Sequence, residues 1–224
     1  MTESEILYGV IGYEAKDESL FDMALTHSSC GLQYNNERLE FLGDAVLELI
    51  SSEILFDSFP DMNEGELSKL RSELVCENGL NEWAMHVHFN RFVKLGKGEE
   101  LSGGRTKPSI ISDAVEAVIA AVYIDGGYAS AKSFVEIIIS YLLKLKQNGL
   151  LVTDAKTELQ EILQGQGKGV PEYRLIKSEG PPHSMTFTVM VVCGDRPLGK
   201  GVGHSKKQAE QDAAKSAVLL LRKN

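Results

Sequence analysis

Five acidic residues stand at helical spacing inside two otherwise apolar stretches of the sequence. Glu37, Glu40 and Asp44 occupy positions i, i+3 and i+7. Asp113 and Glu116 occupy positions i and i+3. On an α-helix these spacings place each group on one face, where carboxylates about 5 Å apart repel by roughly 3 kcal/mol at an effective dielectric near 20. A divalent cation such as Mg²⁺ would relieve that repulsion, so the spacing suggests a metal site, with a plain solvated helix face as the alternative.

Two basic residues precede the second acidic pair. Arg105 and Lys107 stand in a glycine-rich loop that runs from Gly96 to Pro108. Cations beside a carboxylate site can offset the charge on a phosphate group undergoing transfer. We therefore treat Arg105 and Lys107 as candidate contacts to a scissile phosphate, although basic residues in such a loop need no special role.

Other chemistries find little support. The sequence lacks the patterns GxxxxGK[ST], HExxH, GxSxG and ExxH. His27 has no identifiable acidic partner for a catalytic triad and is interpreted as a structural histidine. Cys30, Cys76 and Cys193 are odd in number and lack CxxC spacing, which argues against a disulfide framework and a zinc ribbon. We expect no organic cofactor.

Net charge divides the chain in two. The 224 residues carry 23 Lys and Arg against 32 Asp and Glu, a formal charge of −9 that by itself argues against a nucleic-acid binder. Residues 1–150 hold 12 basic and 24 acidic side chains, whereas residues 151–224 hold 11 and 8. This reversal of sign predicts two units with different roles. We place the first unit at residues 1–148, a linker at 149–153 and the second unit at 154–224.

Hydrophobic periodicity assigns the two units to different fold classes. The first is predicted to be all-α, because its apolar residues recur every three or four positions. The second is predicted to be a small α+β unit of order α-β-β-β-α, with helices over 154–164 and 206–221 and strands over 173–177, 185–193 and 197–202. No apolar run could cross a bilayer and the N-terminus has no cleavage signal, so we expect a cytoplasmic protein without membrane contact.

The second unit offers three candidate contact regions for a nucleic acid. Lys206 and Lys207 follow Ser205 at the predicted start of the last helix, where backbone amides and two ammonium groups would face an anion. His183 belongs to a turn between two predicted strands. The first helix carries a polar stripe of Thr157, Gln160, Glu161 and Gln164. Three such regions on an α-β-β-β-α unit favour double-stranded RNA, which is recognised by its shape across two minor grooves.

The sequence closely resembles bacterial ribonuclease III. Residues 36–47, NERLEFLGDAVL, match that family's signature, and Glu64 in NEGELS and residues 112–117, SDAVEA, match its further acidic positions. The segments GEELSGG at 98–104, KTELQE at 156–161 and SKKQAE at 205–210 match as well. The resemblance covers essentially the whole chain. Thr106 departs from the pattern, since many members of the family carry a basic residue there.

The resemblance implies an endoribonuclease that hydrolyses phosphodiester bonds of double-stranded RNA with Mg²⁺, for which Mn²⁺ is expected to be able to substitute. It implies products with 5′-phosphate and 3′-hydroxyl ends and short 3′ overhangs, and a role in processing rRNA precursors and structured mRNA. Two other functions remain open on the residues alone. They are a non-catalytic regulator that binds double-stranded RNA and a metal-dependent phosphohydrolase of small nucleotides.

The resemblance also assigns roles to individual residues. The positions that it implies for the metal are Glu40, Asp44, Asp113 and Glu116. Of these, Asp44 and Glu116 are expected to be catalytic, and Glu37 and Glu64 are expected to be outer members of the acidic site. The family works as a homodimer. Apolar residues around Phe41 are candidates for its interface, although they could equally belong to the core.

Overall fold

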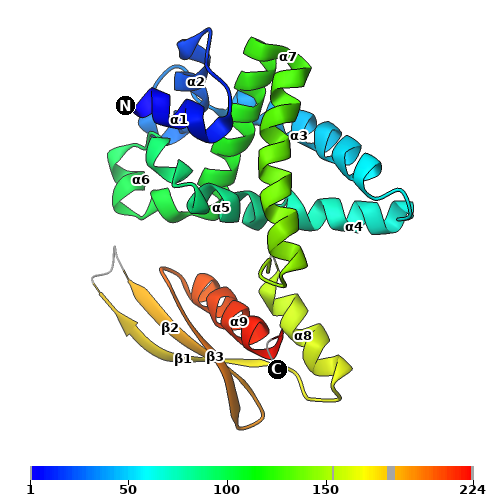
Figure 1. The fold of residues 1–224 in the computed structure, drawn as a ribbon. Coiled ribbons are helices and arrows are strands. Elements are labelled where there is room, and N and C mark those ends of the chain that lie inside the picture. Colours follow the sequence, from blue (N-terminus) through cyan, green and yellow to red (C-terminus); the bar gives the residue numbers. More distant parts are fainter. Residues whose placement is uncertain (1, 153, 181–184, 223–224) are drawn as a thin grey trace. The chain divides into compact units, whose positions relative to one another are not determined.

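The computed structural model describes residues 2–152, 154–180 and 185–222, and the chain divides into two compact units, Met1–Lys144 and Leu145–Asn224 (Figure 1). The first unit is helical, which confirms the all-α prediction. Its helices are α1 (Glu3–Ile11), α2 (Glu18–Ala24), α3 (Glu37–Ser58), α4 (Glu64–Leu74), α5 (Glu77–His86), α6 (Lys97–Leu101) and α7 (Pro108–Gln147), the last of which continues into the second unit. Short 3₁₀ turns lie at Ser28–Cys30, Phe89–Phe92 and Gly104–Thr106. Within the described residues, none of these helices combines the length and the apolar character that a membrane span requires.

Helix α7 forms the centre of the first unit. From Ile110 to Val122 its apolar side chains are at most 6% exposed, as expected of a helix that is covered on nearly every face. At Gly127 the backbone adopts φ 77° and ψ −178°, a conformation that glycine accepts at little cost. The helix therefore consists of two segments, with the break where the sequence places Gly126 and Gly127.

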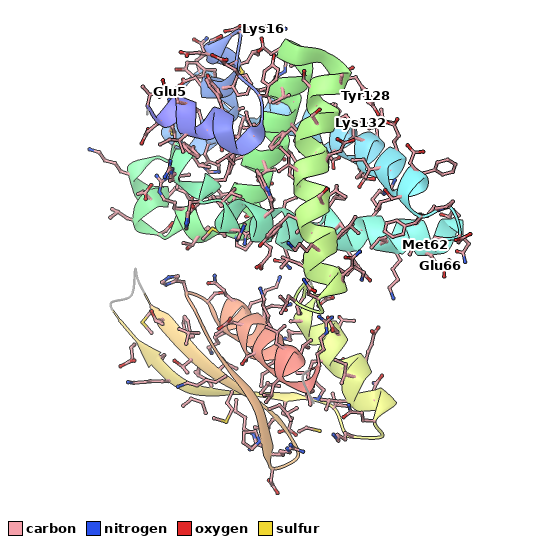
Figure 2. The ribbon with its side chains drawn as sticks, in the orientation of Figure 1. Glu5, Lys16, Met62, Glu66, Tyr128 and Lys132 are labelled. Atoms are coloured by element: carbon pink, nitrogen blue, oxygen red, sulfur yellow. The ribbon has the colours of Figure 1, made fainter. Side chains whose placement is uncertain are left out.

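Contacts on both sides of the break connect α7 with α3 and with the residues that follow α1. The Tyr128 hydroxyl donates to the Glu53 carboxylate of α3, and Lys132 Nζ lies 3.0 Å from the same carboxylate (Figure 2). Near the break in α7, Asp125 accepts hydrogen bonds from the Tyr13 hydroxyl at 2.9 Å and the Lys16 backbone N–H at 2.7 Å. These contacts fix α3 and the start of the chain against the central helix.

The second unit has the predicted order α-β-β-β-α. Its elements are α8 (Ala155–Gly165), β1 (Glu172–Glu179), β2 (Thr186–Cys193), β3 (Arg196–Gly203) and α9 (Lys206–Arg222). The strands form one antiparallel sheet in the order β1-β2-β3, with Val189 of β2 opposite Leu175 and Gly201. Both predicted helices and all three predicted strands are present, with ends that differ by a few residues.

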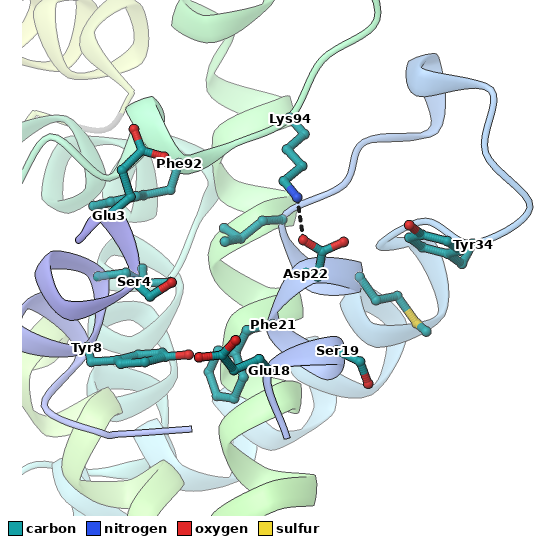
Figure 3. A pocket seen from close by; sticks show the side chains of 13 residues that line it. Glu3, Ser4, Tyr8, Glu18, Ser19, Phe21, Asp22, Tyr34, Phe92 and Lys94 are labelled. Atoms are coloured by element: carbon teal, nitrogen blue, oxygen red, sulfur yellow. Dashed lines mark hydrogen bonds and ion pairs between the residues drawn. The ribbon is translucent and has the colours of Figure 1, made fainter. Parts of the chain in front are cut away.

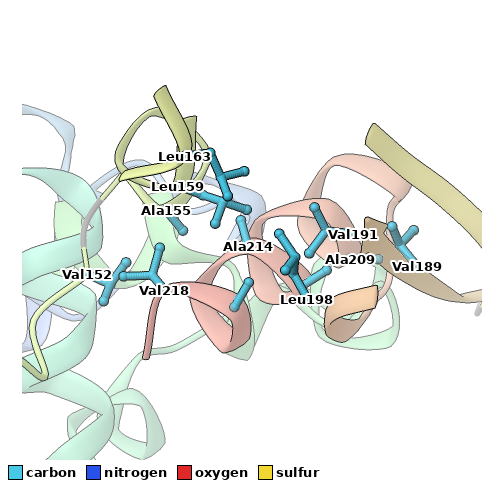
Figure 4. Packing of buried hydrophobic residues seen from close by; sticks show 12 residues of the cluster. Val152, Ala155, Leu159, Leu163, Val189, Val191, Leu198, Ala209, Ala214 and Val218 are labelled. Atoms are coloured by element: carbon cyan, nitrogen blue, oxygen red, sulfur yellow. The ribbon is translucent and has the colours of Figure 1, made fainter. Parts of the chain in front are cut away.

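The core of the second unit lies between its two helices and one face of the sheet (Figure 4). Leu159 and Leu163 of α8 and Val191 of β2 are fully buried there. Helix α9 approaches β3 very closely: a Cβ added at Gly201 would lie 2.1 Å from the backbone nitrogen of Ala213. Glycine on the strand and alanine on the helix therefore allow the two backbones to pack directly together.

Part of the predicted linker belongs to this second unit. Leu151 and Val152 are 7% and 8% exposed, and Val152 is a member of the core cluster. The Arg222 guanidinium, near the end of α9, donates to the carbonyl oxygens of Gly149 and Leu151 and pairs with Glu158 of α8. Residues that composition marks as a linker are therefore held by hydrogen bonds and apolar packing.

Candidate metal and active site

Carboxylates from α3 and α7 meet at one place in the first unit. Ligand oxygens of Glu40, Asp113 and Glu116 all lie within 4.8 Å of one another, and all three side chains are half-buried. We call these residues the carboxylate cluster. Asp44 stands one helical turn after Glu40 and is exposed at its edge. The structure thus brings together residues from the two acidic groups that the sequence places about 70 positions apart.

A glycine makes this meeting of helices possible. Gly43 of α3 is buried against α7, and an added Cβ would lie 1.8 Å from the backbone oxygen of Glu116. Glu40 precedes Gly43 by one turn and Asp44 follows it directly, so both side chains emerge beside the contact. Sequence periodicity did not single out Gly43, because its role depends on a neighbour from a distant part of the chain.

Without a bound cation, the carboxylates of the cluster have pKa values above their ordinary ones. Burial, followed by the charges of Asp44 and Asp113, raises the pKa of Glu116 to about 8. Burial also raises the pKa of Glu40 and of Asp113, with further contributions from neighbouring carboxylates. Three convergent carboxylates whose charges oppose one another fit a hard divalent ion, because such an ion binds oxygen ligands and offsets their repulsion.

Two residues near the cluster were missed as functional candidates. Glu77, the exposed first residue of α5, is the carboxylate that adds most to the effect of burial in raising the pKa of Asp113. The ring of His27 acts on Asp113 in the opposite direction. Each belongs to a different element from the two acidic helices, so no spacing in the sequence could connect them with Asp113.

The two outer acidic candidates lie in different surroundings. Glu37 is exposed and accepts a hydrogen bond from the Asn35 side chain. Its charge is the third-largest cause of the raised pKa of Glu40, after burial and the charge of Asp113.

Glu64 begins α4 and accepts a hydrogen bond from Ser68 at 2.9 Å. It lines a groove of about 580 Å³ that lies between α3 and α4, together with Leu49, Phe56 and Met62. We call this the α3–α4 groove. Glu64 is not among the three residues of the carboxylate cluster.

Both basic candidates of the glycine-rich loop already have partners. Arg105 binds the Glu100 carboxylate through Nε at 2.9 Å and Nη2 at 2.6 Å, and its Nη1 donates to the carbonyl oxygens of Asn90 and Val93 at 2.9 Å. Lys107 pairs with Glu99. These contacts organise the loop, so the proposed contact of either residue with a phosphate stays a prediction.

The second unit presents its polar candidates to solvent. The α8 stripe of Thr157, Gln160, Glu161 and Gln164 is exposed on the side opposite Leu159 and Leu163. At the start of α9 the Ser205 hydroxyl oxygen accepts a hydrogen bond from the Gln208 backbone N–H at 3.1 Å, so Ser205 caps this helix. Lys206 and Lys207 are exposed and have no ion-pair partner among the described residues. His183 lies outside the residues that the structure describes.

A separate hollow lies beside α1 and α2 (Figure 3). Its volume is about 600 Å³, and its walls include Tyr8, Phe21 and the ion pair of Lys94 with Asp22. No member of the carboxylate cluster lines it within the described part of the chain. This hollow is therefore not the place for the chemistry that the carboxylates suggest.

Comparison with known proteins identifies the family. A family model described as "Ribonuclease-III-like" matches residues 17–142, and one described as "Double-stranded RNA binding motif" matches residues 155–221. The protein named ribonuclease 3 from Clostridium botulinum (strain Eklund 17B / Type B) is 47% identical over 218 residues, which cover 96% of this chain and 94% of that protein. The chain belongs to the ribonuclease III family. As a member of that family it is an endoribonuclease with a double-stranded-RNA-binding unit, and the carboxylate cluster is its candidate site for a divalent metal ion.

Other members of the ribonuclease III family agree in sequence and in fold. Ribonuclease 3 of Listeria monocytogenes (serotype 4a, strain HCC23) is 44% identical over 225 residues, with 97% of both chains covered. The crystal structure of the ribonuclease III nuclease domain from Campylobacter jejuni is 45% identical with a TM-score of 0.60, and the match covers 63% of this chain and 96% of that domain. Another structure of that domain, 44% identical with a TM-score of 0.60 and with 62% and 98% covered, is described as showing structural flexibility in a region involved in dimer formation.

Proposed function

We propose that this endoribonuclease hydrolyses phosphodiester bonds of double-stranded RNA with Mg²⁺, leaving 5′-phosphate and 3′-hydroxyl ends with short 3′ overhangs. The observation that carries the proposal is the gathering of the Glu40, Asp113 and Glu116 oxygens within 4.8 Å. Mn²⁺ is expected to substitute, because it accepts the same oxygen ligands. The proposed substrates are rRNA precursors and structured mRNA in the cytoplasm, as the resemblance to the bacterial family implies.

The proposed division of labour follows the positions of the carboxylates. Glu40, Asp113 and Glu116 would hold the metal, with Asp44 beside them. A bound divalent ion would supply Lewis-acid stabilisation of charge on the phosphate and would lower the pKa of water. Asp44 and Glu116 would orient the attacking water, and binding of the ion would displace the proton that the raised pKa of Glu116 retains in the metal-free protein.

The RNA contacts of the second unit follow from exposure and charge. We assign the polar stripe of α8 to ribose hydroxyls and base edges in a minor groove, and Lys206 and Lys207 to phosphates. Ser205 would present the N-terminus of α9 to a phosphate, and His183 would add a further contact. A contact of Arg105 or Lys107 with the scissile phosphate would need the side chain to leave its present acidic partner.

A homodimer is proposed from the exposed apolar face of α3. Phe41, Leu49 and Phe56 are 82%, 60% and 70% exposed and fall on one stripe of the helix beside the α3–α4 groove. Exposed aromatic residues of this size commonly mark protein interfaces. Sedimentation of Phe41→Ser should show a larger monomer fraction than the native chain. Leu101→Ser, at a similarly exposed residue of α6, is the matched control and should sediment as the native chain does.

One experiment separates this function from its alternatives. The protein is incubated with long duplex RNA, single-stranded RNA, duplex DNA and a nucleoside triphosphate, each with and without Mg²⁺. We expect cleavage of duplex RNA alone, and only with Mg²⁺. Binding of duplex RNA without cleavage would favour the regulator, and hydrolysis of the triphosphate would favour the small-nucleotide phosphohydrolase.

A pair of variants tests whether cleavage depends on the carboxylate cluster. Glu116→Gln should abolish cleavage while duplex-RNA binding measured in Ca²⁺ survives. Glu136→Gln, on an exposed position of the same helix, should retain cleavage. Near-normal cleavage by purified Glu116→Gln would contradict the assignment of the site. Sequencing of the product ends tests the proposed phosphate, hydroxyl and overhang.

A further inference from the structure

His27 lies beside the carboxylate cluster without being part of it. Burial raises the pKa of Asp113, and the His27 ring opposes this effect. The hydrogen bond from Lys107 lowers the pKa of Glu99, and the His27 ring adds to that effect. The ring therefore lies within electrostatic range of Asp113 and of Glu99, which stands in the glycine-rich loop. Among the described residues it forms neither a hydrogen bond nor an ion pair with either carboxylate.

The backbone around His27 is fixed to both parts of the site. The His27 N–H donates to the Lys94 carbonyl at 3.1 Å, and Thr26 forms a parallel bridge with Lys94. The Asn36 N–H, directly before α3, donates to the Thr26 carbonyl at 2.9 Å. His27 is therefore held close to Lys94, which precedes the glycine-rich loop, and to Asn36, which precedes the helix that carries Glu40.

Hydrogen bonds also fix which ring nitrogen of His27 carries the proton. The Ser29 backbone N–H donates to Nδ1 at 3.2 Å, and Ser29 Oγ lies 2.8 Å from the same nitrogen. Ser29 Oγ accepts the Gly96 N–H at 2.9 Å, so its own proton can turn toward Nδ1. Because Nδ1 acts as the acceptor, the neutral ring carries its proton on Nε2. That Nε2–H has no partner in the part of the chain that the structure describes.

A phosphate at the site needs hydrogen-bond donors, since the carboxylates repel it. Arg105 and Lys107 are paired with Glu100 and Glu99, whereas the half-buried His27 retains a fixed, unused donor beside Asp113. We propose that His27 Nε2–H donates a hydrogen bond to a phosphate oxygen of the RNA backbone at the carboxylate cluster. His27 is then a substrate-positioning residue, an inference that rests on the proposed cleavage of duplex RNA.

Two substitutions separate this role from the capping role of the ring. Asparagine can place an oxygen where Nδ1 lies and is among the best capping residues, so His27→Asn keeps the bond from Ser29 but loses the outer donor. Glutamine is longer, so His27→Gln can return an N–H group to the position of Nε2. Loss of one hydrogen bond to a charged group corresponds to roughly a 10- to 100-fold effect. We therefore expect His27→Asn to lower kcat/KM on duplex RNA by about that factor at an unchanged Tm, and His27→Gln to recover part of the loss.

Binding provides the readout that a structural role would not move. In Glu116→Gln protein with Ca²⁺, added His27→Asn should weaken duplex-RNA binding at an unchanged Tm. Native-like cleavage by His27→Asn would overturn the inference, and so would equal losses in both variants accompanied by a lower Tm. If the unsubstituted protein itself fails to cleave duplex RNA with Mg²⁺, the proposed function fails, which is a separate and recognisable outcome.

Discussion

Replacing Gly43 with alanine tests how closely α3 and α7 must approach for the carboxylates to meet. The added Cβ would lie 1.8 Å from the Glu116 backbone oxygen, whereas ordinary contacts begin at 3.4 Å. The helices must therefore separate locally by up to about 1.6 Å, the difference between these distances. The cluster oxygens lie within 4.8 Å, so this shift is about a third of the spacing of the site. Overpacking of this kind costs about 1–3 kcal/mol of stability, and a 1 Å misplacement can cost about 100-fold in rate.

The assay compares Gly43→Ala with a matched substitution in another helix. Gly9 lies within α1 and its added Cβ would contact nothing within 4 Å, so Gly9→Ala should keep full activity and gain up to about 1 kcal/mol of helix stability. For Gly43→Ala we expect a lower Tm, a higher Mg²⁺ concentration for half-maximal cleavage and kcat reduced by about 100-fold or more. Circular dichroism establishes that the variant is folded. A folded Gly43→Ala protein with native kcat and native Mg²⁺ dependence would refute the reasoning.

Three further predictions follow from the electrostatics and hydrogen bonds. Because the pKa of Glu116 rises from 4.5 to about 8, metal-free folded protein retains a proton that the unfolded chain releases, so its stability should fall as pH rises from about 4.5 to 8. Thermal melts in a chelator should show this decline to be weaker in Glu116→Gln. Lys206→Ala combined with Lys207→Ala should weaken duplex-RNA binding. In binding titrations over a salt series, the number of phosphate contacts calculated from the salt slope should fall by up to about two. Asp125→Ala removes the acceptor for Tyr13 and for two backbone N–H groups and should lower the free energy of unfolding measured in denaturant titrations.

Each of these predictions has an outcome that would contradict it. Parallel pH profiles for native and Glu116→Gln protein would mean that Glu116 is not the group that titrates. An unchanged salt slope would show that the start of α9 does not touch the RNA backbone. An Asp125→Ala chain of native stability would mean that its hydrogen bonds are replaced by water at no cost.

The sequence predicted the helices and strands well because their apolar residues follow clear periods. The three-residue spacing of Asp113 and Glu116 placed them on one helical face, and both residues do lie on the single helix α7. Spacing alone could not bring Glu40 to Asp113, because that meeting depends on how two distant helices pack. It was the resemblance to a known family that joined the two acidic groups into one site.

The parts of the site that were not predicted depend on tertiary contacts. Arg105 in a glycine-rich loop suggests a free cation, yet its guanidinium is bound by Glu100 and by backbone carbonyls that only the fold brings near. His27 was interpreted as a structural histidine, because a single histidine forms no repeating pattern that connects it with the acidic residues. Its tautomer depends on Ser29 and Gly96, and its neighbour Asp113 is 86 positions away in the chain.

The two buried residues of the linker, Leu151 and Val152, determine where the RNA-binding unit can be separated from the rest of the chain. The family match begins at residue 155, but Leu151 and Val152 contribute apolar surface before that point and Arg222 holds the carbonyl oxygens of Gly149 and Leu151. A fragment that starts at residue 155 would expose a gap at its own core and leave Arg222 without two acceptors. A fragment meant to fold by itself should therefore begin at residue 145, where the second unit begins. A fusion partner should be joined before that residue and not at residue 155, where the family match begins.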